Sequence, residues 1–222
     1  MASVPPIEGH LYPFERPLEA FVFDDGDIVI GEGDHKGRHP VLAAGSNAAP
    51  AQLLRKLGRG ATPVPVTPAL LRDHAIVYSA HFASYGALPA TLYALPGAIA
   101  WLSVTWLDDA QLEQMHVSEN LGVNNDFFVD AEIEVTTEAG ERLTPIGLYT
   151  SRKGPLTHEG RPIRLAELPT AGTSLPALTQ PAVLRYVHKR LGDDTPYSDF
   201  MHRVIADPEF RADVNARIAA FG

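Results

Sequence analysis

The first third of the chain predicts a β-hairpin, followed by a short strand that turns into a helix. Apolar residues at 21–23 and 28–30 flank Asp-Asp-Gly-Asp, and Asp-Gly between β-branched and aromatic runs is typical of a tight hairpin turn. The apolar run 40–44 predicts a strand that ends at Gly45-Ser46-Asn47. Leucines at 53, 54 and 57 then recur at helical spacing, so we expect a helix over 48–57, capped by Ser46 or Asn47.

The middle of the chain predicts further strands around a second helix. Apolar runs predict strands at 74–79, 88–95 and 99–107, with a Pro-Gly turn at 96–97 between the last two. Asp108-Asp109 predicts the start of a helix that ends near residue 119. Apolar and acidic residues alternate from 129 to 135, which is typical of a half-buried antiparallel strand, and 143–150 supplies its partner.

The C-terminal third predicts helices after a long connection. Residues 154–181 are rich in Pro, Gly and Thr, and we expect little regular structure there. Apolar residues at helical spacing predict a helix over 181–191, with Gly192 at its exit. Asp207-Pro208 combines a helix cap with a first-turn proline and predicts a last helix through Phe221.

Composition and charge narrow the classes of function. The chain has 222 residues, of which 45% are hydrophobic and 20% charged, which is ordinary for a globular protein with a substantial core. A formal net charge of −9 argues against general binding of nucleic acid or anionic membranes, because phosphates require clustered Lys and Arg. With no cysteine, disulfides, thiolate metal sites and a cysteine nucleophile are excluded. Residues 1–6 show no secretory signal and no apolar run is long enough to span a bilayer, so we expect a cytoplasmic protein.

The strand-to-helix turn at Gly45-Ser46-Asn47 is the strongest candidate for a binding site. A strand that turns sharply into a helix presents unpaired backbone N–H groups, which suit a carboxylate or a phosphate. The same three residues also suit a simple turn and helix cap.

Other polar residues suggest weaker alternatives. Ser79 and His81 with a distant aspartate suggest a serine hydrolase, but the chain has no Gly-x-Ser-x-Gly sequence. His35 and His39 lie near Asp34 without an obvious third metal ligand. Glu113 is expected on the solvent side of its helix.

The order of these features resembles the gamma-glutamyl cyclotransferase-like family. The resemblance covers residues 41–150 and is closest at Gly45-Ser46-Asn47 and in the segment from Pro96-Gly97 to Trp101. It implies an α+β fold, a small mixed β-barrel flanked by helices, here with a helical C-terminal extension. We therefore divide the chain into an N-terminal hairpin and loop (1–40), a cyclotransferase-like core (41–150), a Pro/Gly-rich connection (151–180) and C-terminal helices packed on the core (181–222).

The resemblance also implies an activity. Family members release an amino acid or amine from a gamma-glutamyl compound and close the glutamyl part into 5-oxoproline. By position, Glu119 is the catalytic residue, first as general base and then as general acid. The implied substrate-binding residues are Ala44, Gly45, Ser46, Asn47 and Tyr149.

The implied chemistry needs a tuned carboxylate but no metal or organic cofactor. The attacking amine is tethered to the carbonyl that it attacks, so ring closure is nearly unimolecular. One carboxylate serves both proton transfers if apolar surroundings raise its pKa, and we expect a raised pKa for Glu119. The expected partner is a small molecule with a gamma-glutamyl or similar carboxylate group, not a nucleic acid or a membrane; a homodimer is left open.

Three departures from the family pattern favour a second interpretation. The family usually has tyrosine where this chain has Ala44, and glycine after the glutamate, where it has Asn120. A family tyrosine shortly after the glutamate corresponds to Phe127 or Phe128. These changes favour a non-catalytic module on the same fold that binds a small molecule or a protein.

Overall fold

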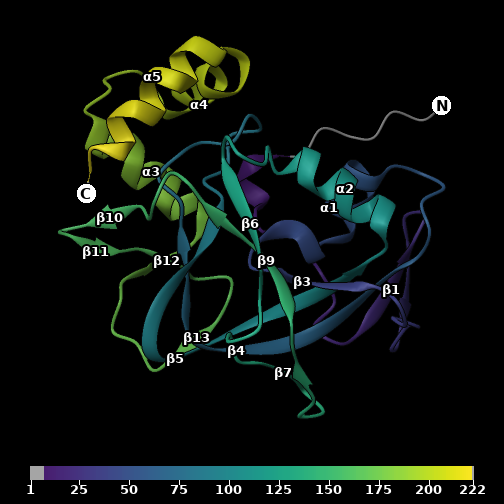
Figure 1. The fold of residues 1–222 in the computed structure, drawn as a ribbon. Helices are drawn as coiled ribbons and strands as arrows, with labels where there is room; N and C mark the ends of the chain where they lie inside the picture. Colours follow the sequence, from purple (N-terminus) through teal and green to yellow (C-terminus); the bar gives the residue numbers. More distant parts are fainter. Residues whose placement is uncertain (1–7, 222) are drawn as a thin grey trace.

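Two long antiparallel strands form the centre of the fold. The computed structural model describes residues 8–221, so the predictions for residues 1–7 and for Gly222 lie outside the described residues. Strands β4 (Val64–Tyr78) and β5 (Ala90–Leu107) pair along most of their length, and both bend strongly (Figure 1). The shorter strands are β1 (Phe21–Asp24), β2 (Asp27–Ile30), β3 (His39–Ala43), β6 (Asn125–Asp130), β7 (Val135–Thr137), β8 (Arg142–Leu143), β9 (Ile146–Ser151), β10 (Thr157–His158), β11 (Arg161–Pro162), β12 (Arg164–Leu165), β13 (Thr170–Ala171) and β14 (Ala177–Leu178).

The main sheet is mixed. Its order is β14-β12-β4-β5-β3-β9-β6, in which β3 pairs with β9, and β12 with β14, in parallel. Strands β1 and β7 also pair with β4, and β13 pairs with β5. The α+β class and the mixed sheet predicted from the sequence are confirmed. Within residues 8–221, the strand pairing does not close the sheet into the expected barrel.

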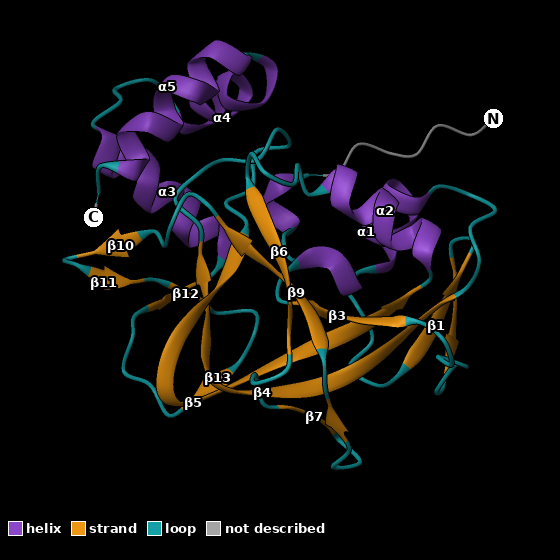
Figure 2. Ribbon diagram, viewed as in Figure 1, coloured by secondary structure: helices purple, strands orange, loops and turns teal. Residues whose placement is uncertain are grey.

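Five α-helices accompany the described part of the sheet (Figure 2). They are α1 (Pro50–Leu57), α2 (Asp109–Ser118), α3 (Gln180–Leu191), α4 (Tyr197–Ala206) and α5 (Pro208–Ala219), and short 3₁₀ turns lie at η1 (Gly9–Leu11) and η2 (Ser46–Ala48). Local sequence explains two of the helix starts. The Asp108 side chain accepts the backbone N–H of Gln111, and that of Asp207 accepts two N–H groups at the start of α5. Within the described residues, the structure has no helix that is both long and apolar enough to cross a membrane.

The predicted turn at Pro96-Gly97 is wrong. These residues lie inside β5, which continues from Ala90 to Leu107. The Gly97 N–H donates to Asp73 Oδ1 of the neighbouring strand over 2.7 Å, where the strand register shifts. The Pro-Gly pair therefore accompanies an irregularity within two paired strands and does not separate them.

The predicted half-buried strand over 129–135 is also wrong. Strand β6 ends at Asp130, whose side chain accepts the N–H groups of Glu132 and Ile133 and turns the chain. Val135 then begins a different strand, β7. The alternating pattern of apolar and acidic residues therefore spans the end of β6 and the start of β7, and it does not mark a single strand.

Two hydrophobic clusters position the helices. The larger cluster joins the central strands to buried residues of α3, α4 and α5, including Leu184, Phe200 and Val214. The smaller cluster joins α1, through Leu53, and α2, through Met115, to β1 and β3. Each fully buried side chain of this kind contributes roughly 1.5–3 kcal/mol. The clusters fix α1 and α2 side by side, and the C-terminal helices against another part of the sheet (Figure 1).

Candidate functional site

The turn at Gly45-Ser46-Asn47 is a loop with free backbone donors. Strand β3 ends at Ala43, and residues 46–48 form a single 3₁₀ turn before α1 begins at Pro50. The N-cap of α1 is Ala49, so the expected capping by Ser46 or Asn47 is wrong. Within the described part of the chain, the N–H groups of Gly45, Ser46 and Asn47 have no hydrogen-bond acceptor. The loop therefore keeps the donors that an anion requires.

Tyr12 closes one side of this loop from a distant part of the chain. Its hydroxyl accepts the N–H of Ala90 over 2.7 Å. A Cβ atom added to Gly45 would lie only 2.1 Å from that hydroxyl oxygen. Glycine at position 45 is therefore required by the close approach of Tyr12. Burial raises the pKa of the Tyr12 hydroxyl well above its usual value, so this hydroxyl stays neutral.

We expect Gly45→Ala to destabilise the protein by about 1–3 kcal/mol, because the added methyl overlaps the Tyr12 hydroxyl. Denaturant unfolding measures the loss. The double variant Gly45→Ala with Tyr12→Phe recovers part of it, since the next Tyr12 atom lies 3.2 Å from the added Cβ. Strictly additive costs for the two substitutions would contradict this contact.

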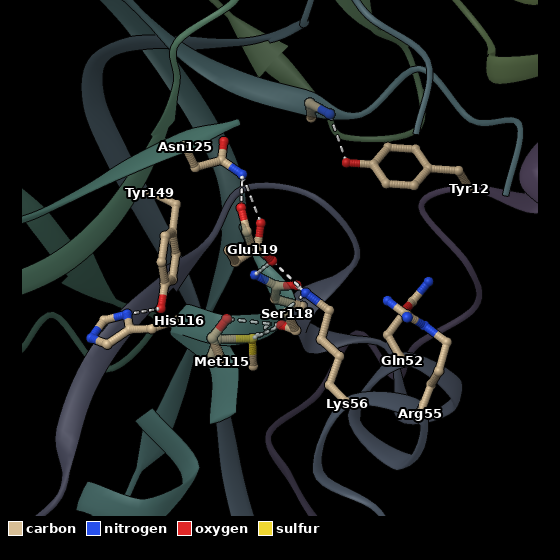
Figure 3. Close-up of polar contacts among 12 residues, drawn as sticks. Tyr12, Gln52, Arg55, Lys56, Met115, His116, Ser118, Glu119, Asn125 and Tyr149 are labelled. Atoms are coloured by element: carbon tan, nitrogen blue, oxygen red, sulfur yellow. Dashed lines mark hydrogen bonds and ion pairs between the residues drawn. The ribbon is translucent and has the colours of Figure 1, made fainter. Parts of the chain in front are cut away.

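Glu119 lies at the end of α2, and its carboxylate meets the loop. As the C-cap residue of α2, it accepts hydrogen bonds from Asn47 Nδ2 to Oε1 and from Asn125 Nδ2 to Oε2, each over 3.0 Å. Lys56 of α1 forms an ion pair with the same carboxylate and also donates to Asn47 Oδ1 over 2.8 Å. Figure 3 shows Asn125 and Lys56 converging on Glu119 from different sides. Asn47 thus links the catalytic candidate directly to the binding loop.

The charge state of Glu119 differs from the expectation. Burial raises the pKa of its carboxyl group, but the Lys56 ammonium and hydrogen bonds from Lys56 and Asn47 outweigh burial, with a smaller effect from Arg55. The net pKa lies below the usual value for glutamate. The predicted raised pKa is therefore wrong, and Glu119 is ionised at neutral pH.

Glu119 and the loop border the same cavity. It has a volume of about 340 Å³, which falls within the roughly 300–1,000 Å³ range of small-molecule sites. All the residues predicted from the sequence as site residues line it: Ala44, Gly45, Ser46, Asn47, Glu119 and Tyr149. Further lining residues were not assigned to this site from the sequence, among them Tyr12, Arg55, Lys56, Tyr85, Asn125, Arg211 and Asn215. His81 also lines the cavity, although the sequence suggested it only as part of a hydrolase.

Tyr149 lines the cavity, but its hydroxyl is already engaged. That hydroxyl lies 2.7 Å from Nδ1 of His116, and its ring lies against Phe127 with ring centroids 4.9 Å apart. Burial raises the pKa of the Tyr149 hydroxyl, with Glu119 adding to the effect. Burial likewise raises the pKa of Tyr85, to about 12. Tyrosine hydroxyls therefore border the cavity in neutral form, although none occupies the family position before the loop.

The structure argues against the serine-hydrolase alternative, because Ser79 cannot reach a substrate. Ser79 Oγ lies 2.8 Å from Nδ1 of His81 and 2.6 Å from Ser151 Oγ, but Ser79 is fully buried and does not line the cavity. Burial, with a smaller effect from Lys153, lowers the pKa of His81 to about 4. A hydroxyl without access to substrate cannot attack it, so this pair serves the structure.

The histidines near Asp34 do not form a metal site. His35 stacks on Trp106, and His39 lies 2.7 Å from an Asp109 oxygen. The described residues contain no group of three or more His, Cys, Asp or Glu that could hold a metal ion. Glu113 is exposed, as predicted.

The chain resembles a gamma-glutamyl cyclotransferase. That solved structure is 17% identical with a TM-score of 0.41, and the match covers 60% of this chain and 66% of the other. A protein of Arabidopsis thaliana is 16% identical with a TM-score of 0.41, over 54% of this chain and 72% of the other. An uncharacterized Homo sapiens protein is 13% identical with a TM-score of 0.41, over 88% and 98%. No protein-family model and no curated protein matches the chain.

The resemblance found in the sequence thus recurs among solved structures. At this level of similarity, the activities of these proteins carry no argument about the reaction of this chain.

Proposed function

We propose that the chain is a gamma-glutamyl cyclotransferase-like enzyme that releases 5-oxoproline from a gamma-glutamyl amine or peptide. The observation that carries the proposal is the position of Glu119, whose carboxylate borders the same cavity as the free amides of the Gly45-Ser46-Asn47 loop and is joined to them through Asn47. The loop amides bind the α-carboxylate of the glutamyl part, and Glu119 receives its amine. No metal or organic cofactor is required for this reaction.

The reaction forms one bond and breaks one. The α-nitrogen of the substrate attacks its own γ-carbonyl carbon, and the amide bond to the leaving nitrogen breaks. The nitrogen enters as an ammonium with three protons; one stays on the lactam, Glu119 carries one to the leaving nitrogen, and one goes to solvent. An ionised Glu119 is ready to accept the first proton, and a glutamic acid with a low pKa donates readily to the leaving amine.

A second candidate function is binding without catalysis. The ammonium group of Lys56 forms an ion pair with Glu119, and only 4% of the lysine side chain is exposed. A carboxylate already neutralised by a lysine is a weak base, which favours a module that binds a gamma-glutamyl or similar small molecule and releases it unchanged.

A screen of gamma-glutamyl compounds separates the two functions. We expect the purified protein to release 5-oxoproline from at least one gamma-glutamyl amino acid or amine, measured by chromatography with mass detection. Binding without 5-oxoproline formation across the screen would favour the binding module and contradict the proposed enzyme.

A further inference from the structure

The cavity carries positive charge in an acidic protein. Its charged lining residues other than histidine are Arg55, Lys56, Arg211 and Glu119, although the whole chain has a formal net charge of −9. Lys56 is paired with Glu119, which leaves the two arginines uncompensated among these residues. A concave site with a surplus of positive charge attracts anions and holds them better than a flat surface does. One carboxylate of the ligand binds the loop amides. The two uncompensated arginines therefore indicate that the ligand carries a second carboxylate.

Arg211 is the more buried of the two arginines, since Arg55 is exposed. It belongs to α5, and its Nη1 donates to the backbone oxygens of Val204 and Ile205 over 2.8 and 3.2 Å. Its Nη2 and Nε have no hydrogen-bond partner within residues 8–221. A guanidinium fixed on one side presents its remaining N–H groups for a carboxylate at little cost in conformational entropy.

The wall around Arg211 is also fixed. Asn215, one turn further along α5, accepts the N–H of Phe82 over 2.7 Å and donates to the Phe82 oxygen over 3.3 Å. Phe82 follows His81, which lines the same cavity. These hydrogen bonds fix α5 to the cavity wall, so the last helix forms part of the site. This contribution comes from outside residues 41–150, where the resemblance to the family lies.

We propose that Arg211 binds a carboxylate on the leaving group, so that the preferred substrates are gamma-glutamyl amino acids or peptides and not simple gamma-glutamyl amines. This inference rests on the proposed function, in which the loop amides hold the α-carboxylate of the glutamyl part. The leaving nitrogen lies at the far end of the glutamyl chain, so a carboxylate beyond it needs its own cation. Arg211, which lines the cavity from α5, supplies that cation.

Two unreactive probes test the inference by binding alone. Glutarylglycine lacks the attacking amine and keeps both carboxylates, whereas glutarylglycinamide differs only in having a neutral amide at the leaving end. We expect the wild-type protein to bind the acid roughly tenfold or more tightly than the amide in calorimetry, since a hydrogen-bonded ion pair contributes about that much. Arg211→Gln removes the preference and leaves the affinity for the amide nearly unchanged, and Arg211→Lys retains part of the preference.

Control variants make the test specific to Arg211. Arg217→Gln removes a positive charge from the same helix, where the side chain donates to the Leu191 oxygen and does not line the cavity. It should keep the preference. A wild-type protein that binds both probes equally, or a preference lost in Arg55→Gln and not in Arg211→Gln, would overturn the inference. The wild-type comparison stands even if Arg211→Gln folds poorly.

The binding test and the 5-oxoproline screen together separate this inference from the proposed function. If the wild type forms no 5-oxoproline but prefers the acid through Arg211, only the proposed catalysis fails. If 5-oxoproline forms but the preference is absent, the enzyme stands and the role of Arg211 is refuted. If neither probe binds, the inference is overturned.

Discussion

Glu119→Gln is expected to reduce 5-oxoproline formation by about 10²–10⁴-fold, the usual contribution of a positioned general acid–base residue. The amide side chain keeps nearly the same shape but cannot accept the proton that the attacking amine loses. The measurement is the initial rate of 5-oxoproline release from the best substrate of the screen. The loss should lie in kcat, because the loop amides that bind the carboxylate remain.

Glu113→Gln is the matched control, since Glu113 lies on the same helix but is exposed. It should keep wild-type activity. Glu119→Gln also leaves the Lys56 ammonium without its counterion, so thermal unfolding and near-UV circular dichroism must show that the variant is folded. Glu119→Asp, which keeps the charge, provides a second variant if it is not. A folded Glu119→Gln protein with more than about a tenth of the wild-type rate contradicts the assigned role.

The parts of the fold that the sequence predicted well depend on neighbouring residues. The hairpin at Asp25-Gly26, the capped start of α2 after Asp108 and the start of α5 after Asp207 each follow from a few consecutive side chains. Turn and capping preferences act over one or two turns of chain, so they are legible without the rest of the molecule.

The errors arose where distant strands decide the local structure. Pro96-Gly97 is typical of a turn, but pairing with β4 carries β5 through it, and Asp73 on β4 satisfies the Gly97 N–H. Proline and glycine set local preferences only, and a long ladder of strand hydrogen bonds outweighs them. The same limit explains why the alternation from 129 to 135 was assigned to one strand.

The candidate site was predicted in its local parts and missed in its long-range parts. The loop was found because a strand that turns sharply into a helix presents free N–H groups, and Glu119 was found because the order of features resembles a family. Lys56 lies 63 residues before Glu119, and its pairing reverses the expected direction of the pKa shift. Its position on the polar face of α1, after Leu53 and Leu54, was the only local signal. Arg211 had no signal at all, because nothing near it in sequence indicates that α5 reaches the cavity.

Lys56→Met is expected to shift the acid limb of the pH–rate profile to higher pH. In the wild type, the net effect of Lys56 and its neighbours lowers the pKa of Glu119, so Glu119 remains ionised and able to accept a proton below the usual range of glutamate. Methionine fills a similar volume without charge, and burial then dominates and raises this pKa. The measurement is kcat/KM for 5-oxoproline release across acidic to neutral pH. Lys189→Met, at an exposed position of α3, is the matched control and should leave the profile unchanged.

The stability cost of Lys56→Met should also depend on pH. A carboxyl group with a lowered pKa in the folded state stabilises the wild type above its unfolded pKa of about 4.3, and this stabilisation is lost as the pH falls through the lower folded value. In Lys56→Met the folded pKa is raised, so Glu119 favours folding only at acid pH and opposes it as the pH rises.

Breaking a largely buried pair costs about 3 kcal/mol at neutral pH, because a carboxylate with 17% of its side chain exposed is left without a cation. Denaturant unfolding at neutral and acid pH should therefore show a difference between the proteins that shrinks as Glu119 is protonated. An equal cost at both pH values would mean that Lys56 stabilises the fold by packing alone and does not control the charge of Glu119.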